Sequence, residues 1–163
     1  MEGIKYFLFT FLLLSCQPAY KNIEDNTFKN KFVDLLIKFE HLKNTEKARF
    51  KLDTLTDFKW EKMYIFGGSE DKEGMNKRLG FKWEYSFDWD ILQEGDFMFV
   101  FVRDNQVVST SYFMRDGLPC NNFSISNGDN FSTPQTSLFY IQKEFYKDDK
   151  LNWEFRITNA SVK

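Results

Sequence analysis

Carboxylates recur in the segment FKWEYSFDWDI at 81–91, where Glu84, Asp88 and Asp90 share one side of a two-residue alternation. In a strand, Asp88 and Asp90 would lie about 6 to 7 Å apart at Cα. Paired carboxylates can divide the acid and base roles of glycoside hydrolysis. A solvent-facing strand shows the same alternation without catalysis, and no second group of residues in the sequence converges on this pair. We therefore favour a non-enzymatic protein, with Asp88 and Asp90 as candidate ligand contacts.

Aromatic side chains occupy the other side of the same segment. Trp83, Tyr85 and Trp89 alternate with the carboxylates, so a strand would present them as one stripe. An exposed stripe could stack on the apolar faces of sugar rings, whereas a buried stripe would supply much of a core. Burial is favoured, because an exposed apolar patch of this size is a liability in a soluble domain unless it is a site. The burial of these rings separates the two interpretations.

Nucleophilic and metal chemistry have little support. Cys120 and the single histidine, His41, allow a Cys–His pair by number alone, and neither neighbourhood carries a catalytic signature. No spacing of Cys, His, Asp or Glu matches a zinc or calcium motif. We expect no metal and no cofactor.

The first sixteen residues have the order of a targeting segment. A short polar start precedes an apolar run at 6–14, which ends in Ser15 and Cys16. Such a run reaches only about 13 Å as a helix, too little for a hydrocarbon core of ~30 Å. Leu13, Leu14, Ser15 and Cys16 resemble the lipobox of bacterial lipoproteins.

This resemblance implies a cellular location. In bacterial lipoproteins the cysteine thiol receives a diacylglycerol, the signal is removed before the cysteine, and fatty acids such as palmitate hold the protein on a membrane. We therefore expect 1–15 to be a signal peptide and Cys16 to be the lipidated residue. The polar segment 16–26 is expected to be a flexible tether, followed by one domain at 27–163. The expected location is the cell envelope, periplasmic or surface-facing, with the membrane as partner through Cys16.

Composition limits the remaining classes. A mature chain of this length suits a single domain with its own core. The net charge is −2 and no basic stripe is present, which disfavours nucleic acid as a partner. If Cys16 is lipidated, Cys120 is the only thiol left, so no intrachain disulfide is expected.

The sequence predicts two helices. Residues spaced by three and four positions over 28–42 form one helical face, and Asn26 or Thr27 is the expected N-cap. A short second helix is expected from Ser69 to Gly80, because carboxylates follow Ser69 and a glycine suits the C-terminus.

Several stretches predict strands. The runs at 60–66, 81–91, 97–102 and 106–114 are rich in aromatic and branched residues, and Asp104-Asn105 predicts a tight turn between the last two. The runs at 137–146 and 151–158 predict a second hairpin. The stretch 115–136 is expected to be a long irregular loop, and such loops are often functional.

Together these patterns predict an α+β domain, in which an N-terminal amphipathic helix and a short second helix pack on an antiparallel sheet of five or six strands. The segments DFKWEKMYIF, LGFKW and VFVRDNQVV, within 57–108, are also similar to small bacterial envelope proteins of uncharacterised activity. We expect a lipid-anchored binding or interaction module, with a protein as one candidate partner at loop 115–136. The alternative is a carbohydrate-binding or carbohydrate-cleaving lipoprotein that uses 81–91.

Overall fold

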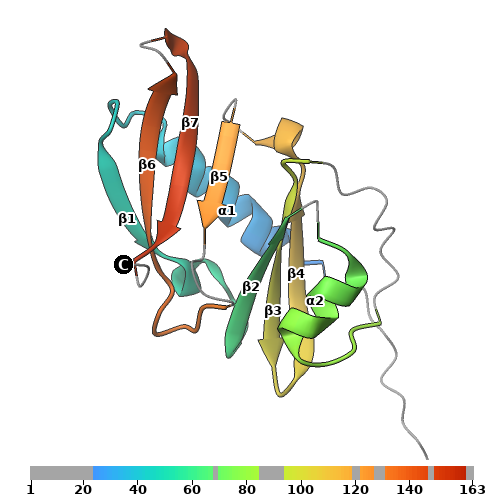
Figure 1. The fold of residues 1–163 in the computed structure, drawn as a ribbon. Coiled ribbons are helices and arrows are strands. Elements are labelled where there is room, and N and C mark those ends of the chain that lie inside the picture. Colours follow the sequence, from blue (N-terminus) through green and yellow to red (C-terminus); the bar gives the residue numbers. More distant parts are fainter. Residues whose placement is uncertain are drawn as a thin grey trace, which may run out of the picture.

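The computed structural model describes residues 24–67, 70–84, 94–118, 122–126, 131–146 and 149–160. Within these residues the chain forms two α-helices and seven strands in two sheets (Figure 1). One sheet has the order β1-β6-β7-β5 and the other β2-β3-β4. The elements are α1 (Asn26–Phe39), β1 (Lys47–Lys51), η1 (Leu52–Leu55), β2 (Lys62–Gly67), α2 (Lys72–Leu79), β3 (Phe97–Arg103), β4 (Gln106–Phe113), η3 (Arg115–Gly117), β5 (Asn122–Ser126), β6 (Leu138–Tyr146) and β7 (Asp149–Asn159).

The helix α1 begins after Asp25, whose carboxylate accepts hydrogen bonds from the backbone N–H groups of Thr27 (2.8 Å) and Phe28 (3.2 Å). The N-cap expected at Asn26 or Thr27 is therefore wrong by one or two residues. The predicted apolar face is confirmed, because Phe28, Phe32 and Leu36 are fully buried. Residues 24–26, expected in the tether, belong to the fold, since Glu24 also pairs with Thr110 of β4.

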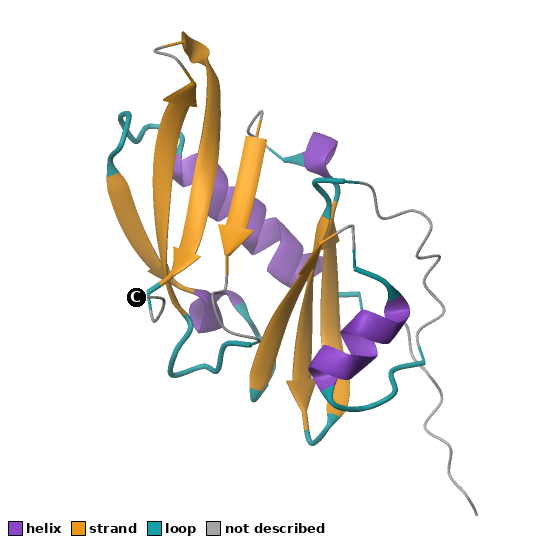
Figure 2. Cartoon of the chain, in the orientation of Figure 1, coloured by secondary structure: helices purple, strands orange, loops and turns teal. Residues whose placement is uncertain are grey.

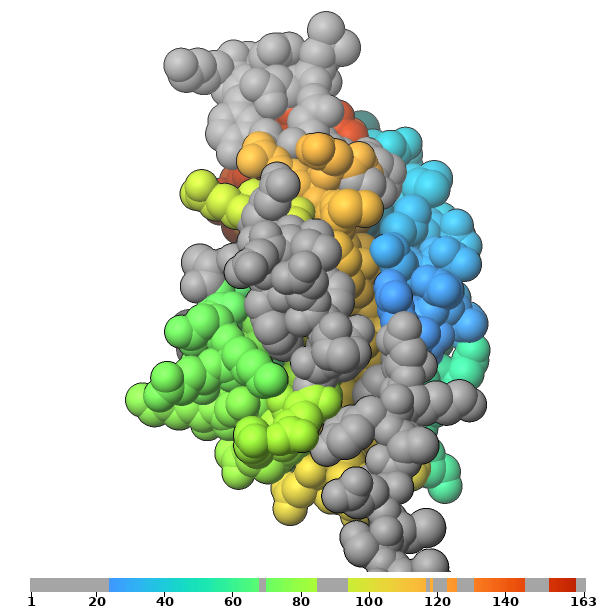
Figure 3. All heavy atoms as spheres, turned by 90° about the vertical axis from the view of Figure 1, so that its right-hand side faces the viewer, coloured from blue at the N-terminus to red at the C-terminus, as the bar shows by residue number. Residues whose placement is uncertain are grey.

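The three-stranded sheet is built around the predicted hairpin of β3 and β4. Asp104 and Asn105 form its turn with φ of 53° and 56°, as tight hairpins require. All residues of β3 except Arg103 are buried, which fits a central strand covered on both faces. Figure 3, viewed from the right-hand side of Figure 1, has α2 (green) and α1 (blue) on opposite sides of the molecule, with gold-coloured atoms of β4 between them.

The helix α2 covers the face of this sheet that α1 does not. Asp71 caps it by accepting from the Gly74 N–H (2.8 Å), and Gly80 ends it with φ of 80°. The predicted end is confirmed, whereas the helix begins at Lys72, later than the start expected at Ser69, a residue outside the described ranges. The side chains of Met75 and Leu79 are buried against this face of the sheet.

The four-stranded sheet contains the second predicted hairpin, β6 and β7, which pair in antiparallel register from Phe139 opposite Asn159 to Tyr146 opposite Asp149. The segment expected as an irregular loop at 115–136 is only partly so, because β5 lies within it and pairs in parallel with β7. The edge strand β1, which the sequence analysis did not predict, pairs with β6.

The helix α1 joins the two sheets. It passes behind both of them in Figure 2, and its buried face packs against aromatic and aliphatic side chains from both sheets. At its C-terminal end the buried Lys143 of β6 donates from Nζ to the Glu40 carbonyl (2.5 Å). The same ammonium lies 4.1 Å from the centre of the Trp153 ring, a cation–π contact. Lys143 therefore fixes the end of the helix to the sheet.

The predicted α+β class is confirmed, and so is the packing of helices on sheet. The single antiparallel sheet is replaced by two sheets, one of which contains a parallel pair. Residues 81–84 of the predicted long strand lie outside helices and strands, and 85–91 lies outside the described residues. Among the described helices, none has the length and apolar character to cross a membrane.

Candidate binding surface on the four-stranded sheet

One face of the four-stranded sheet packs on α1, and no described helix covers the other face, which is turned to the viewer in Figure 1. Alternation along a strand decides which side chains lie on this open face. They come from β1, β6 and β7 and are mainly polar or cationic: Lys47, Arg49, Lys51, Tyr140, Gln142, Glu144, Glu154, Arg156 and Thr158. We call this set the open face.

The strand register places these side chains in rows across the sheet. Lys47 lies opposite Gln142, and Gln142 lies opposite Arg156. Neighbouring strands are about 4.8 Å apart, so Lys47 and Arg156 flank the Gln142 amide at roughly 10 Å from each other at Cα. The next row runs from Arg49 through Tyr140 to Thr158. The cations of β1 therefore lie beside neutral hydrogen-bonding side chains of β6, and the first row ends in a further cation on β7.

A shallow depression of about 220 Å³ lies over these rows. Its lining comes from the three strands and the residue after β7: Lys47, Tyr140, Gln142, Arg156, Thr158, Asn159 and Ala160. The lining contains no carboxylate, and its side chains supply two cationic groups together with amides and hydroxyls. This composition suits a ligand rich in hydrogen-bond acceptors. It offers no acid and base pair for hydrolysis.

Positive charge on the open face is neutralised unevenly. Arg156 pairs with Glu144 (2.8 Å) and Glu154 (3.0 Å), and Lys51 pairs with Asp53 (2.8 Å). Lys47 and Arg49 form no ion pair with any other residue in the described ranges. Unneutralised positive charge is thus concentrated on β1, at the edge of the sheet.

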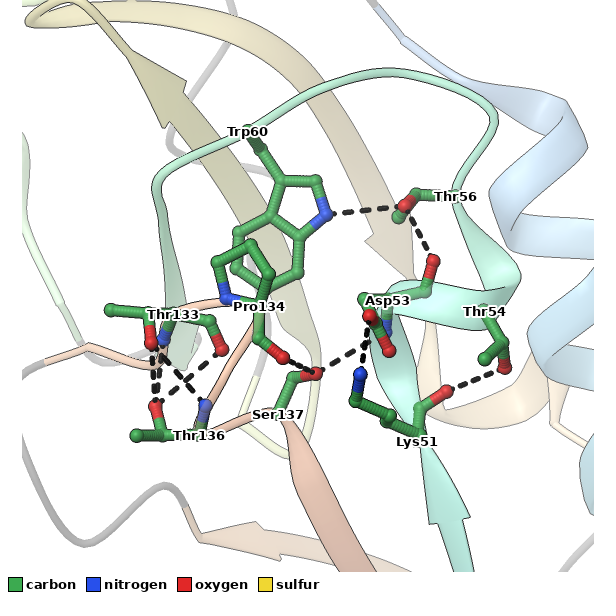
Figure 4. A network of polar contacts seen from close by, with 9 residues as sticks. All are labelled: Lys51, Asp53, Thr54, Thr56, Trp60, Thr133, Pro134, Thr136 and Ser137. Atoms are coloured by element: carbon green, nitrogen blue, oxygen red, sulfur yellow. Dashed lines mark hydrogen bonds and ion pairs between the residues drawn. The ribbon is translucent and has the colours of Figure 1, made fainter.

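A polar network supports the end of β1 (Figure 4). The Lys51 ammonium contacts Asp53, the Asp53 N–H donates to the Ser137 hydroxyl at 3.4 Å, and that hydroxyl donates to the Pro134 carbonyl at 2.9 Å. Beside it the Trp60 indole N–H donates to Thr56 (3.1 Å). These bonds hold η1 against the segment that precedes β6, so the β1 end of the open face is a fixed platform.

Beneath the depression, the buried side chain of Asn159 continues this network. Its amide donates to the Ser132 hydroxyl (2.6 Å) and to the Thr136 carbonyl (3.0 Å). Asn159 therefore ties the end of β7 to the segment before β6. A buried amide with such partners serves the fold, and it leaves ligand binding to the outward side chains.

The structure places Trp83 in the buried cluster between α2 and the three-stranded sheet, away from the open face. Its side chain is 6% exposed and packs with Met75 and Leu79, while its backbone N–H donates to the Asn76 side chain (2.8 Å). Trp83 is therefore withdrawn from the aromatic platform expected for a sugar ligand. Tyr85, Asp88, Trp89 and Asp90, the other candidate contacts, lie outside the described residues.

The carboxylates of the predicted hydrolytic set have one described member, Glu84. It is exposed and accepts a hydrogen bond from Lys82 (2.5 Å), which lowers the pKa of the Glu84 carboxyl. A carboxyl in this environment stays ionised at neutral pH, so Glu84 lacks the raised pKa of a general acid.

Asp96 and Tyr112 form a second cluster of titratable groups. The Tyr112 hydroxyl donates to one carboxylate oxygen of buried Asp96 (2.5 Å), and the Arg115 backbone N–H donates to the other (2.8 Å). Burial first, and then the hydrogen bond and negative charge of Asp96, raise the pKa of Tyr112 far above its usual value. These bonds join the start of β3 to the end of β4, so we assign the cluster to the fold.

The described residues include only one member of the Cys–His pair that the sequence allows by number. His41 is exposed, and Cys120 and Cys16 lie outside the described residues. Within the ranges described above, no group of three or more Cys, His, Asp or Glu side chains is placed to hold a metal ion.

Comparisons with known proteins do not assign the chain to a family. No family model matches the chain, and the searches of curated proteins and of solved structures found no match.

The open face was missed by the sequence analysis, although a signal for it exists. In KARFK at 47–51 the charged residues alternate with Ala48 and Phe50, and in LFYIQ at 138–142 polar Tyr140 and Gln142 alternate with apolar neighbours. This two-residue period marks strands with one outward polar side. Which of the several alternating strands would lack a covering helix depends on the three-dimensional arrangement of α1 and α2.

Proposed function

We propose that the chain is a lipid-anchored binding protein of the bacterial cell envelope, held to the membrane through Cys16 and contacting its partner with the open face of the four-stranded sheet. The observation that carries the proposal is that helices cover the faces of the two sheets differently. Both faces of the three-stranded sheet carry a helix, whereas the open face has hydrogen-bonding side chains and a depression in place of one. Polar surfaces positioned on a rigid sheet are suited to recognition.

A binding role is favoured over catalysis by the chemistry of the depression. Its lining supplies cations, amides and hydroxyls without a carboxylate, as described above. Proton transfer needs a group with a suitable pKa within reach of the reacting atom, and the open face presents its two glutamates already paired with Arg156. The geometry therefore supports holding a partner through hydrogen bonds and charge.

The position of α1 is compatible with an anchor at Cys16. Glu24 pairs with β4, at the opposite end of α1 from Lys143 and the nearby β1. The helix has 14 residues and spans about 21 Å. From Cys16 to Glu24 the chain reaches at most about 26 to 29 Å when extended. A membrane-attached Cys16 would therefore be joined to the fold at the end of α1 that is farther from β1.

The anchor is tested by intact-mass analysis of the protein purified from membranes, beside a Cys16→Ala variant. We expect the mass of the cleaved, acylated chain for the native sequence and loss from the membrane fraction for the variant. An unmodified Cys16, or membrane retention that the substitution leaves unchanged, contradicts the anchor.

The binding surface is tested by affinity capture from an envelope extract with a Tyr140→Ala, Gln142→Ala double variant. Lys38→Ala, Lys77→Ala is the matched control, because both lysines are exposed on helices away from the open face. We expect a captured partner to be lost with the open-face variant and retained with the control. Equal capture by both variants would place the partner elsewhere.

A further inference from the structure

The strand β1 is an edge of the four-stranded sheet, and its outer side differs from the other sheet edges. The edge of β2 is occupied by Ser132, which exchanges two backbone hydrogen bonds with Met63 (2.8 and 2.9 Å). The edge of β4 is occupied by the Asp25 N–H, which donates to the Thr110 carbonyl (2.8 Å). The outer side of β1 has no backbone partner among the described residues. It is available as a pairing template.

The remaining edge, that of β5, lies between the two sheets. The ring of Phe123 on β5 stacks on that of Phe97 on β3, with 4.7 Å between ring centres. An added strand at β5 would thus meet the three-stranded sheet. The edge of β1 has no such neighbour and lies at the outer end of the sheet in Figure 1.

The register shows which backbone groups of β1 face outward. Beyond the end of β1, the Leu52 N–H donates to the Ser137 carbonyl (2.9 Å), so this pair is hydrogen-bonded across the two chains. Hydrogen-bonded and non-hydrogen-bonded pairs alternate in an antiparallel ladder. Ala48 and Phe50 therefore direct their N–H and C=O groups to β6, whereas Lys47, Arg49 and Lys51 direct theirs to the open edge.

The three residues with outward backbone groups are also the three cationic residues of β1. Lys51 is partly engaged, since its ammonium pairs with Asp53 and its carbonyl accepts from the Thr54 hydroxyl (2.7 Å). Lys47 and Arg49 have neither an ion pair nor a backbone partner on this side among the described residues. Two adjacent sites of an outer edge thus offer N–H, C=O and a positive charge together.

We propose that this edge accepts an extended segment of a partner protein that carries carboxylates at alternate positions, adding a strand beside β1. The inference deepens the proposed function and rests on it, because it names the partner of the same sheet. Residues of the added strand opposite Lys47 and Arg49 place their side chains on the open face, close enough to form cross-strand ion pairs. Main-chain hydrogen bonds supply affinity in this mode of recognition, and alternate side chains supply specificity.

Charge disfavours pairing of β1 with β1 of a second copy of the chain. Antiparallel pairing of β1 with β1 of another molecule, centred on Arg49, would set Arg49 against Arg49 and Lys47 against Lys51. Like charges directly opposite one another destabilise a strand pair. A strand that carries carboxylates would instead place a negative charge opposite each of these cations.

The test uses a short synthetic peptide that alternates glutamate with valine and threonine, and a matched peptide with lysine in place of glutamate. We expect saturable binding of the acidic peptide at low salt, with the backbone amide signals of Lys47 and Arg49 among those that shift most in NMR spectra. The basic peptide and a Lys47→Glu, Arg49→Glu variant should each weaken binding about tenfold or more. Lys38→Glu, Lys77→Glu, which changes the net charge equally, is the control and should change affinity little.

Methylation of the peptide backbone separates strand addition from simple charge attraction. N-methyl groups on the residues whose N–H groups face β1 should abolish binding, while N-methyl groups on the alternate residues should leave it largely intact. Arg49→Pro tests the protein side, because it removes an outward N–H that does not bond to β6. Retained β6 pairing in its NMR spectrum shows that the variant is folded.

Different results would contradict strand addition at β1 and the proposed function of the open face. Absence of binding, equal binding of both peptides, or equal effects of the two methylation patterns overturns strand addition and leaves the edge cations as protection against unwanted pairing. If the native partner is captured through Tyr140 and Gln142 but is unaffected by Arg49→Pro, the proposed function stands and this inference fails. If no capture depends on the open face, the proposed function itself fails.

Discussion

The three-stranded sheet has a helix on each of its faces, whereas the four-stranded sheet has α1 on one face and charged and polar side chains on the other. The difference is visible along single strands. In β3 six consecutive residues are buried, while in β1 exposed Lys47, Arg49 and Lys51 alternate with Ala48 and Phe50. Cover on both faces removes a sheet from contact with other molecules, and cover on one face leaves it available.

The same contrast separates stability from recognition. Buried aromatic rings gather where α1 meets both sheets, so the free energy of folding depends on this interior. The open face contributes paired charges and exposed donors, which stabilise a fold little. Substitutions in the two regions should therefore have different consequences.

The largest effect is expected from Phe99→Ala in β3. Phe99 is fully buried, and its ring lies 5.2 and 5.3 Å from those of Phe28 and Phe32 on α1. The cavity and lost contacts should lower the free energy of unfolding by about 3 to 5 kcal/mol, measured by urea denaturation. Tyr140→Ala on the open face is the comparison and should cost no more than about 1 kcal/mol. Similar losses for the two variants would contradict the division between interior and open face.

A smaller effect is expected where α1 is attached to the four-stranded sheet. Lys143→Met keeps most of the apolar stem but removes the hydrogen bond to the Glu40 carbonyl and the contact with Trp153. We expect a loss of about 1 to 3 kcal/mol in the free energy of unfolding, because a buried acceptor loses its charged donor. Lys59→Met, at an exposed lysine, should change stability by less than about 0.5 kcal/mol.

Alkaline pH should act on the three-stranded sheet through Tyr112. Its pKa is raised in the folded protein, so the unfolded chain loses its proton first, from a pKa of about 10. The stability from the protonated hydroxyl is complete below pH ~10 and falls as pH rises above it, by at most about 1.4 kcal/mol per pH unit for one proton. Urea denaturation between about pH 8 and 11, which brackets the pKa of the unfolded tyrosine, should show a shallower decline for Tyr112→Phe than for the native chain.

Burial also raises the pKa of Tyr64, on β2, and this tyrosine contributes a decline of the same sign. A Tyr64→Phe, Tyr112→Phe double variant should therefore be less sensitive to alkaline pH than either single variant. An unchanged decline in the double variant would show that other groups govern alkaline unfolding.

The parts of the fold that depend on neighbouring residues in the sequence were predictable. The spacing of Phe28, Phe32 and Leu36 predicts the buried face of α1, and Asp104-Asn105 predicts the hairpin turn because Asx residues tolerate positive φ. The capping residue of α1 was harder, since Asp25, Asn26 and Thr27 are all suitable N-caps.

The rest depends on contacts between distant parts of the chain. The strand β5 is five residues long, and its backbone pairs with β7, about thirty residues later in the sequence. The division into two sheets likewise follows from where α1 and α2 pack. For the same reason the sequence placed binding at 81–91, whereas the structure buries Trp83 and exposes Lys47, Arg49 and Tyr140.

The smallest effect is expected from Lys47→Thr, Arg49→Thr on β1. Both side chains are exposed and form no ion pair within the described ranges, so the free energy of unfolding should change by less than about 0.5 kcal/mol. Phe50→Ala on the same strand is the matched control, because Phe50 is 8% exposed and its ring stacks on Phe139 at 5.7 Å. This control should cost about 3 kcal/mol or more. A loss above about 1 kcal/mol in the threonine variant would mean that these cations support the fold. Near-neutral stability would mean that β1 keeps two unneutralised cations at its edge without a structural need for them, as expected of residues that act on a partner.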